Sequence, residues 1–158
     1  MCPAWARKEY AMKTRFANLI FEIVAAAGQH DRFAQRGPHV SLRIENPPYL
    51  PLNIEAWDSP IAGENRRISV AHYFEQEGDL VPDPEVEIRD DGWPIELSQV
   101  AGYTQVTVYR EDGPMLFAPQ SKREVMHFLN ETWAPNLRAQ RFIEAAQKLA
   151  RPVVEETP

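Results

Sequence analysis

The segment from Glu75 to Glu96 contains nine carboxylates and one cation, Arg89. Carboxylate oxygens are the ligands that Mg²⁺ and Ca²⁺ prefer, and metal ions held in this way activate water in many hydrolases. In a β-strand, however, side chains such as Asp83 and Glu85 project from one face at intervals of about 6.6–6.8 Å. Because a cation needs its oxygen ligands within about 2.6 Å of itself, a straight row does not enclose one. The spacing therefore disfavours a metal site.

The same segment is similar in part to the P-D…[D/E]-x-K motif of metal-dependent nucleases, through Asp83 and Glu85. Those enzymes place the two acids on different strand segments and use a lysine to orient the attacking water. Here the two acids are two residues apart, and residues 66–110 contain no lysine. A metal-dependent hydrolase or nuclease stays the alternative hypothesis. Its ligands or bases would be Asp79, Asp83, Glu85 and His72.

The histidines and glycines lack the spacings of common catalytic and nucleotide-binding motifs. None of the four histidines pairs with another as H-x₃₋₅-H or H-E-x-x-H, and the chain contains no G-x-G-x-x-G, G-x-x-x-x-G-K-[ST] or G-x-S-x-G motif. His72 lies in an alternating run, where a hydrogen-bonded structural role is favoured over a catalytic one. The single cysteine, Cys2, excludes an intramolecular disulfide. We therefore expect no catalytic residue, no metal ligand set and no cofactor.

Turn-forming residues offer a structural explanation of the acidic segment. The pieces GD at 78–79 and PDP at 82–84 contain residue types that favour turns. We expect the aspartates of both pieces to accept hydrogen bonds from nearby backbone N–H groups. Glu85 and Glu87 would then face water on the next strand, where like charges discourage pairing with another sheet.

The apolar pattern changes from helical to alternating along the chain. Apolar residues recur at helical spacing from Phe16 to Ala27, and Gly28 is the expected end of this helix. The alternative is that the pattern continues through Phe33 until Gly37-Pro38 ends it. Six alternating runs follow, each with one apolar face. They begin near Val40, Leu52, Ile68, Val86, Trp93 and Val106. Their connections are too short for crossover helices, so we expect an antiparallel meander of about six strands.

Two details of this sheet are open to test. Asp91-Gly92 is typical of a two-residue hairpin turn. Trp93 is expected to share the inner face of its strand with Ile95 and Leu97, because the three residues alternate with more polar neighbours.

Helical spacing returns near the end of the chain. Ser121 and Glu124 have the spacing of a capping box, and Pro135 is expected to break or kink the helix that they begin. A second apolar stripe runs from Leu137 to Ala150. The predicted fold class is α+β, with an N-terminal helix, an antiparallel sheet of about six strands and a C-terminal helical pair packed on one face.

The length of 158 residues is typical of one domain, and we assign it to residues 12–150. Residues 1–11 are expected to be a disordered extension, with Met12 as an alternative start, and residues 151–158 a disordered tail. No apolar run is long enough for a membrane span and the first residues do not resemble a signal peptide, so we expect a cytoplasmic protein.

The charge distribution bears on possible partners. The net charge is −6, and the sequence pI is about 5.2. Cations are concentrated near the two ends of the chain, around an acidic middle. Proteins that bind duplex DNA usually present a basic surface, so we expect no strong DNA binding, although the two ends could meet and form such a surface. The oligomeric state stays open.

The stretch ISVAHYFEQEGDLVPDPEVEI, followed closely by WPIEL, resembles a family of small uncharacterised domains from plasmid, phage and integrative-element proteins. The resemblance covers residues 68–97. Its hallmark is a tyrosine-rich strand, a Q-x-G-D turn and a D-P-E motif, here Tyr73, Gln76, Gly78, Asp79, Asp83, Pro84 and Glu85. The resemblance implies that the protein belongs to a bacterial mobile genetic element.

Together these features favour a non-enzymatic accessory or protein-interaction domain. Its partner would be another protein, whose identity the sequence leaves open. The candidate binding residues are Tyr73, Gln76, Asp79, Asp83 and Glu85.

Overall fold

The computed structural model describes residues 13–61, 63–101, 104–111 and 120–150. The expectations for residues 1–11, Met12 and the tail at 151–158 therefore lie outside the described residues. The elements are α2 (Arg15–Ala26), α3 (His30–Ala34), β1 (Val40–Asn46), β2 (Tyr49–Trp57), β3 (Arg67–Gln76), β4 (Asp79–Arg89), β5 (Pro94–Ala101), β6 (Thr104–Arg110), α4 (Lys122–His127), the π-helix η1 (Phe128–Trp133), α5 (Ala134–Ala139) and α6 (Phe142–Ala150).

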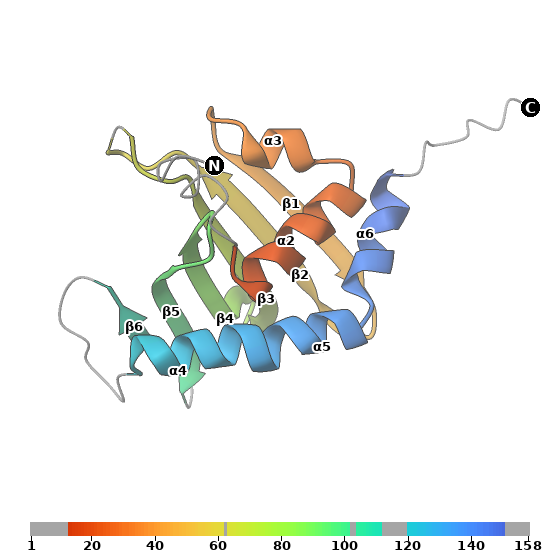
Figure 1. Ribbon diagram of the computed structural model, residues 1–158. Helices are drawn as coiled ribbons and strands as arrows, with labels where there is room; N and C mark the ends of the chain where they lie inside the picture. The colour runs from red at the N-terminus through yellow and green to blue at the C-terminus, as the bar shows by residue number, and fades with distance from the viewer. Residues whose placement is uncertain (1–12, 62, 102–103, 112–119, 151–158) are drawn as a thin grey trace, which may run out of the picture.

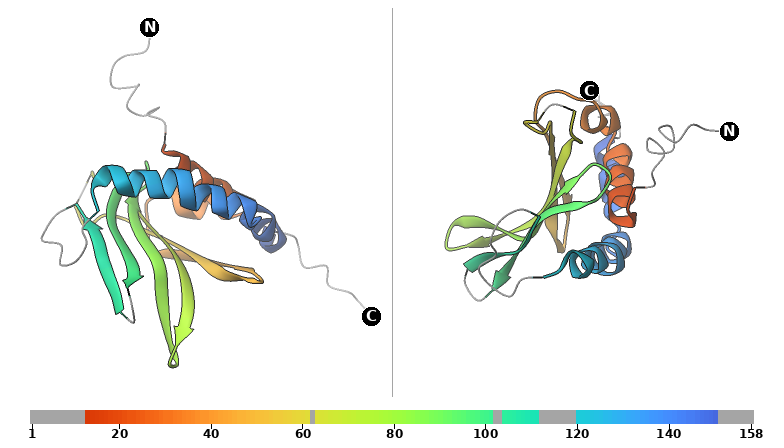
Figure 2. Two further views of the ribbon diagram at one scale, coloured as in Figure 1. Left: turned by 90° about the horizontal axis from the view of Figure 1, so that it is seen from below. Right: turned by 60° about the vertical axis from the view of Figure 1, so that its left-hand side comes forward.

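The six strands form one antiparallel sheet in the order of the sequence, which confirms the predicted meander. The N-terminal helix and the C-terminal helices lie in one layer against one face of the sheet (Figure 1). No described helix covers the opposite face, which we call the open face (Figure 2, right). The predicted α+β class is therefore confirmed.

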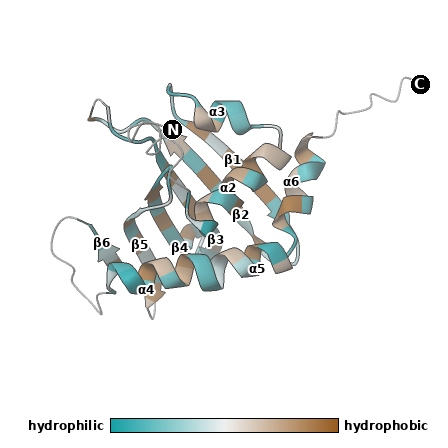
Figure 3. Ribbon diagram, viewed as in Figure 1, coloured by the Kyte–Doolittle hydropathy of each residue, from teal (hydrophilic) through white to brown (hydrophobic). Residues whose placement is uncertain are grey.

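Apolar residues from both layers form one core. Helix α2 presents a continuous apolar face to the sheet, with Phe16, Leu19 and Ile23 fully buried. Beneath it, Ile54, Val70, Val86 and Leu97 are buried in neighbouring strands. In Figure 3, brown apolar segments recur along the strands behind α2. Burial of these side chains from water holds the helix layer against the sheet.

Local capping explains where α2 begins and ends. The Thr14 side chain accepts a hydrogen bond from the Ala17 backbone N–H at 3.2 Å, which satisfies one free donor of the first turn. Gly28 has a φ of 75°, a left-handed conformation that suits glycine and ends the helix as predicted. The short α3 follows as a separate helix.

The C-terminal helices differ from the prediction in one respect. The Ser121–Glu124 capping box is present, but Pro135 does not break the helix. The π-helix η1 precedes the proline, and the Ala134 N–H bonds to the Leu129 carbonyl five residues back. This wider turn lets the helical run continue through α5. The break falls instead at Arg141, whose φ is 65°.

Two expected turns also differ from those observed. The PDP piece at 82–84 lies inside β4, while the β3–β4 turn is formed by Glu77 and Gly78 alone. At the β4–β5 turn, the Arg89 N–H bonds to the Trp93 carbonyl, so the loop holds three residues rather than two. A register shift between Glu87 and Ile88 follows, and Trp93 is 42% exposed rather than turned inward.

Candidate functional site

The open face carries Glu85, Glu87 and Glu96 of the acidic segment. Residues directly opposite each other in an antiparallel sheet share a face, so the register defines rows across it. One row consists of Glu55, Ser69, Glu87, Glu96 and Arg110. The next consists of Asn53, Ala71, Glu85, Ser98 and Thr107. Glutamates of the neighbouring strands β4 and β5 therefore lie side by side, and Glu55 of β2 lies in the same row, across β3.

Glu85 and Glu87 are half-buried, and the pKa of each is raised. For Glu85 the causes are burial and then the negative charges of Glu55 and Glu96. For Glu87 burial again acts first; Arg67 opposes it, while Glu96 adds to it. The sequence suggested that these two carboxylates face water, whereas in the structure they are half-buried. Their charged forms are destabilised by crowding within a partly desolvated face.

A hollow of about 230 Å³ lies over these rows. Its walls come from four strands, β2 to β5. It is lined by Trp57, Ser69, Glu85, Glu87, Glu96 and Ser98. An indole beside three carboxylates and two hydroxyls suits a cationic group, which gains both from charge pairing and from the aromatic face.

Tyr73 extends the open face toward the β3–β4 hairpin. Its hydroxyl is hydrogen-bonded to Glu85, and burial, followed by the charges of Glu85 and Glu55, raises the pKa of Tyr73. A second hollow of about 340 Å³ lies here. Its lining consists of Ser41, Leu42, Arg43, Asn53, Glu55, Tyr73 and Leu80. Of the predicted site residues, the structure thus brings Tyr73 and Glu85 together.

The other predicted site residues lie elsewhere. Gln76 and Asp79 are paired at the tip of the β3–β4 hairpin, away from the hollows. Asp83 lies at a register shift in β4, and its Oδ1 accepts a hydrogen bond from the Val100 backbone N–H at 3.0 Å. Asp83 therefore joins β4 to β5 rather than holding a local turn.

His72 is fixed as a neutral structural residue. Its Nδ1 lies 3.2 Å from the Pro51 carbonyl oxygen, and its Nε2 lies 3.3 Å from Nε1 of Trp133. Because the indole N–H only donates, Nε2 must accept, so the proton is on Nδ1. Burial lowers the pKa of His72, although the hydrogen bond to Pro51 acts in the opposite direction. A proton added at Nε2 would displace the Trp133 hydrogen bond.

The described residues contain no group of three or more His, Cys, Asp or Glu side chains placed to hold a metal ion. Glu85 and Glu87 project from the same side of β4, two residues apart, as the strand spacing implies. Asp79, Asp83, Glu85 and His72, the ligands of the alternative hypothesis, lie at separate places: the hairpin tip, the β4–β5 contact, the open face and the helix side.

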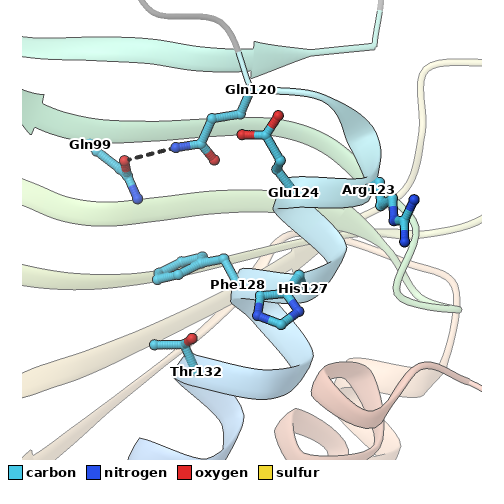
Figure 4. A pocket seen from close by; sticks show the side chains of 7 residues that line it. All are labelled: Gln99, Gln120, Arg123, Glu124, His127, Phe128 and Thr132. Carbon is cyan, nitrogen blue, oxygen red and sulfur yellow. Dashed lines mark hydrogen bonds between the residues drawn. The ribbon is translucent and has the colours of Figure 1, made fainter.

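A third hollow, of about 500 Å³, lies between β5 and the α4–η1 helix. Figure 4 shows its lining, which consists of Gln99, Gln120, Arg123, Glu124, His127, Phe128 and Thr132. The amides of Gln99 and Gln120 are joined at 3.5 Å, and Phe128 and Thr132 lie on the same side of the helix as Gln99 (Figure 4). No sequence pattern predicted this hollow, although the proline that follows η1 could have indicated an irregular helix.

Residues 18–143 match the family described as a domain of unknown function (DUF6908), and the chain therefore belongs to this family. No curated protein and no solved structure matches the chain. Among the described helices, none has the length and apolar character that crossing a bilayer would require.

Proposed function

We propose that this DUF6908 domain is a non-enzymatic protein-interaction domain whose open sheet face receives a basic segment of a partner protein. The observation that carries the proposal is the hollow in which Trp57 stands beside Glu85, Glu87 and Glu96. Two neighbouring strands, β4 and β5, supply these carboxylates, and no described helix covers them.

Electrostatics gives this face a preference for cations. The pKa values of Glu85 and Glu87 are raised first by burial, which destabilises their negative charges in the free protein. A lysine or arginine placed among them would add a positive charge to those of Arg67, near Glu87, and Arg110, which pairs with Glu96 at 3.1 Å. Trp57 would contact its apolar stem or guanidinium plane. The negative field of the acidic middle would also accelerate encounter with a basic partner.

The proposed setting is a bacterial mobile genetic element, where the domain would act as an accessory protein. Support for this setting comes from the resemblance of residues 68–97 to domains of plasmid, phage and integrative-element proteins. Two residues of that motif, Tyr73 and Glu85, are hydrogen-bonded to each other on the open face.

The proposal is tested by titrating the ¹⁵N-labelled protein with an arginine-rich peptide and with a glutamate-rich peptide of equal length. We expect the arginine-rich peptide to shift the Trp57 indole resonance and the amide resonances of Ser69 and Ser98. The variant Glu85→Gln/Glu87→Gln/Glu96→Gln should bind it at least about tenfold more weakly, because the charge contacts are lost.

A matched control removes three carboxylates from the helices: Asp31→Asn/Glu131→Gln/Glu144→Gln. This variant has the same net charge as the open-face variant. If both variants bound the peptide equally weakly, net charge alone would explain the loss, and the proposal would be contradicted. A thermal-shift series with Mg²⁺ and Mn²⁺ covers the metal-dependent alternative. A stabilisation that the open-face variant loses would favour a metal site.

A further inference from the structure

Strand β1 forms one edge of the sheet and is regular along its length. Its seven residues contain no proline and no lysine, which are common means of protecting an edge. The register shift near its end places Ile44 opposite Leu52 and Asn46 opposite Tyr49, so the extra residue belongs to β2. The outer side of β1 is therefore a straight strand edge.

The two edges of the sheet differ in what pairs with them. At β6, the Val108 carbonyl accepts a hydrogen bond from the Gln120 backbone N–H at 2.6 Å. At β1, β2 is the partner strand, and no other backbone group of the described residues bonds to it. Alternate N–H and C=O groups of an antiparallel edge strand point outward. Helix α6 packs on β1 from the helix side of the sheet (Figure 2).

The charged residues of β1 would match those of a second, antiparallel β1 strand. Arg43 and Glu45 project on the same face, with Nε and Oε1 2.7 Å apart, and their side chains are 49% and 62% exposed. In an antiparallel pair of two such strands centred on Ile44, each Arg43 lies opposite the partner's Glu45. Oppositely charged cross-strand pairs stabilise such a register. A pair centred on Arg43 would instead place two arginines opposite each other.

We propose that two copies of the chain associate through β1, antiparallel, with Ile44 opposite the partner's Ile44. The sheet then continues from one copy into the other around a two-fold axis, and the contact is isologous. This inference is independent of the proposed function, because it rests on the outer edge of β1 and not on the hollow beside Trp57.

Charge reversal tests the pairing by sedimentation velocity over a range of protein concentrations. We expect the parent to sediment as a dimer at high concentration and Arg43→Glu to sediment as a monomer, because two glutamates would then face each other. Arg43→Glu/Glu45→Arg restores opposite charges in the same register and should restore the dimer. Far-UV circular dichroism establishes that each variant is folded.

The matched control is Arg123→Glu, which makes the same charge change on exposed α4, at the opposite end of the sheet (Figure 1). It should leave the dimer unchanged. A parent that is monomeric at all concentrations overturns the proposal. So does an Arg43→Glu variant that dimerises like the parent, or a double variant that fails to recover.

Cysteine crosslinking tests the register directly, in a Cys2→Ser background. Residues opposite each other have Cα atoms about 4.5–5.5 Å apart, a separation that a disulfide spans. A mixture of Arg43→Cys and Glu45→Cys proteins should therefore crosslink more than either protein alone. Stronger crosslinking of Arg43→Cys with itself would contradict the register centred on Ile44.

Discussion

At the scale of single residues, Glu85 and Glu87 combine charge with partial burial. Each has a folded-state pKa raised above its unfolded value, first by burial. For such a group the stabilising contribution is fully present below the unfolded pKa, near 4.3, and is lost as the pH rises through the folded pKa. At neutral pH both carboxylates therefore destabilise the fold.

Glu85→Gln should accordingly stabilise the protein at pH 7 and have little effect near pH 4. Because the side chain is half exposed, solvent screening limits the gain to a few tenths of a kcal/mol and at most about 1 kcal/mol. Thermal denaturation at the two pH values measures the effect. Glu75→Gln, at an exposed position of the same strand pair, serves as the control. A lower melting temperature of Glu85→Gln at pH 7 would contradict the interpretation.

The two aspartates of the acidic segment should respond differently to substitution. Asp83→Ala removes the acceptor of the Val100 N–H and should destabilise the protein by about 0.5–2 kcal/mol. Asp83→Asn keeps an oxygen at this place and should recover much of the loss. Asp79 is exposed at the hairpin tip, so Asp79→Ala should stay within about 0.5 kcal/mol. Urea denaturation gives all three values, and equal losses at both positions would refute the assignment.

His72 predicts a stability that depends on pH. Its folded pKa is lowered, first by burial, so below about pH 6.5 the unfolded chain binds the proton more readily than the folded one. Stability is therefore present above that pH and falls as the pH drops through it. In urea denaturation between pH 8 and pH 5, His72→Gln should show a shallower decline than the parent. Parallel curves for the two proteins would rule out this role of His72.

At the scale of elements, the sequence predicted the features that depend only on residues close together in the chain. The Ser121 capping box and the stop at Gly28 depend on neighbouring residues, and both are present. Pro135 could not be placed in this way, because the π-turn before it depends on how the helix packs. The PDP piece was expected to be a turn, yet Pro82 pairs with Tyr73 of β3 and Asp83 bonds to the Val100 N–H of β5, which keeps the piece in a strand.

The contact between the β4–β5 turn and α2 gives a prediction at this scale. Gly92 has a φ of 97°, and a Cβ atom there would lie 1.9 Å from Oγ1 of Thr14, the cap of α2. Gly92→Ala should therefore destabilise the protein by about 2 kcal/mol or more, through backbone strain and loss of the cap. Gly63→Ala, at a φ of 85° with open space around the Cβ, isolates the strain. Equal melting temperatures of the two variants would exclude the contact with Thr14.

At the scale of the whole molecule, the open face exists only because six strands are in register. Glu55, Glu85 and Glu96 are far apart in the sequence, and alternation alone does not say which residues lie opposite each other. The sequence could therefore indicate an acidic solvent side, and it named Tyr73 and Glu85. It could not identify the hollow beside Trp57, since four strands contribute to its walls.

The two ends of the described chain do meet, as a basic face would require. Two of their arginines, however, pair with carboxylates. Arg15 lies 3.1 Å from Glu131, and Arg138 lies 2.9 Å from Glu22, each between α2 and the C-terminal helices. These ion pairs reduce the positive charge that the helix layer could otherwise present to phosphates.

We therefore predict no binding to duplex DNA at physiological salt beyond a weak background that falls steeply as salt is added. A mobility-shift assay at about 0.05 to 0.2 M salt measures this binding, because affinity that depends on phosphate contacts falls steeply over that range. Glu22→Gln/Glu131→Gln frees the two arginines and should strengthen only this salt-sensitive background. Sub-micromolar binding by the parent would contradict this prediction and would indicate a local basic surface built from the two ends, because the net charge of −6 repels DNA.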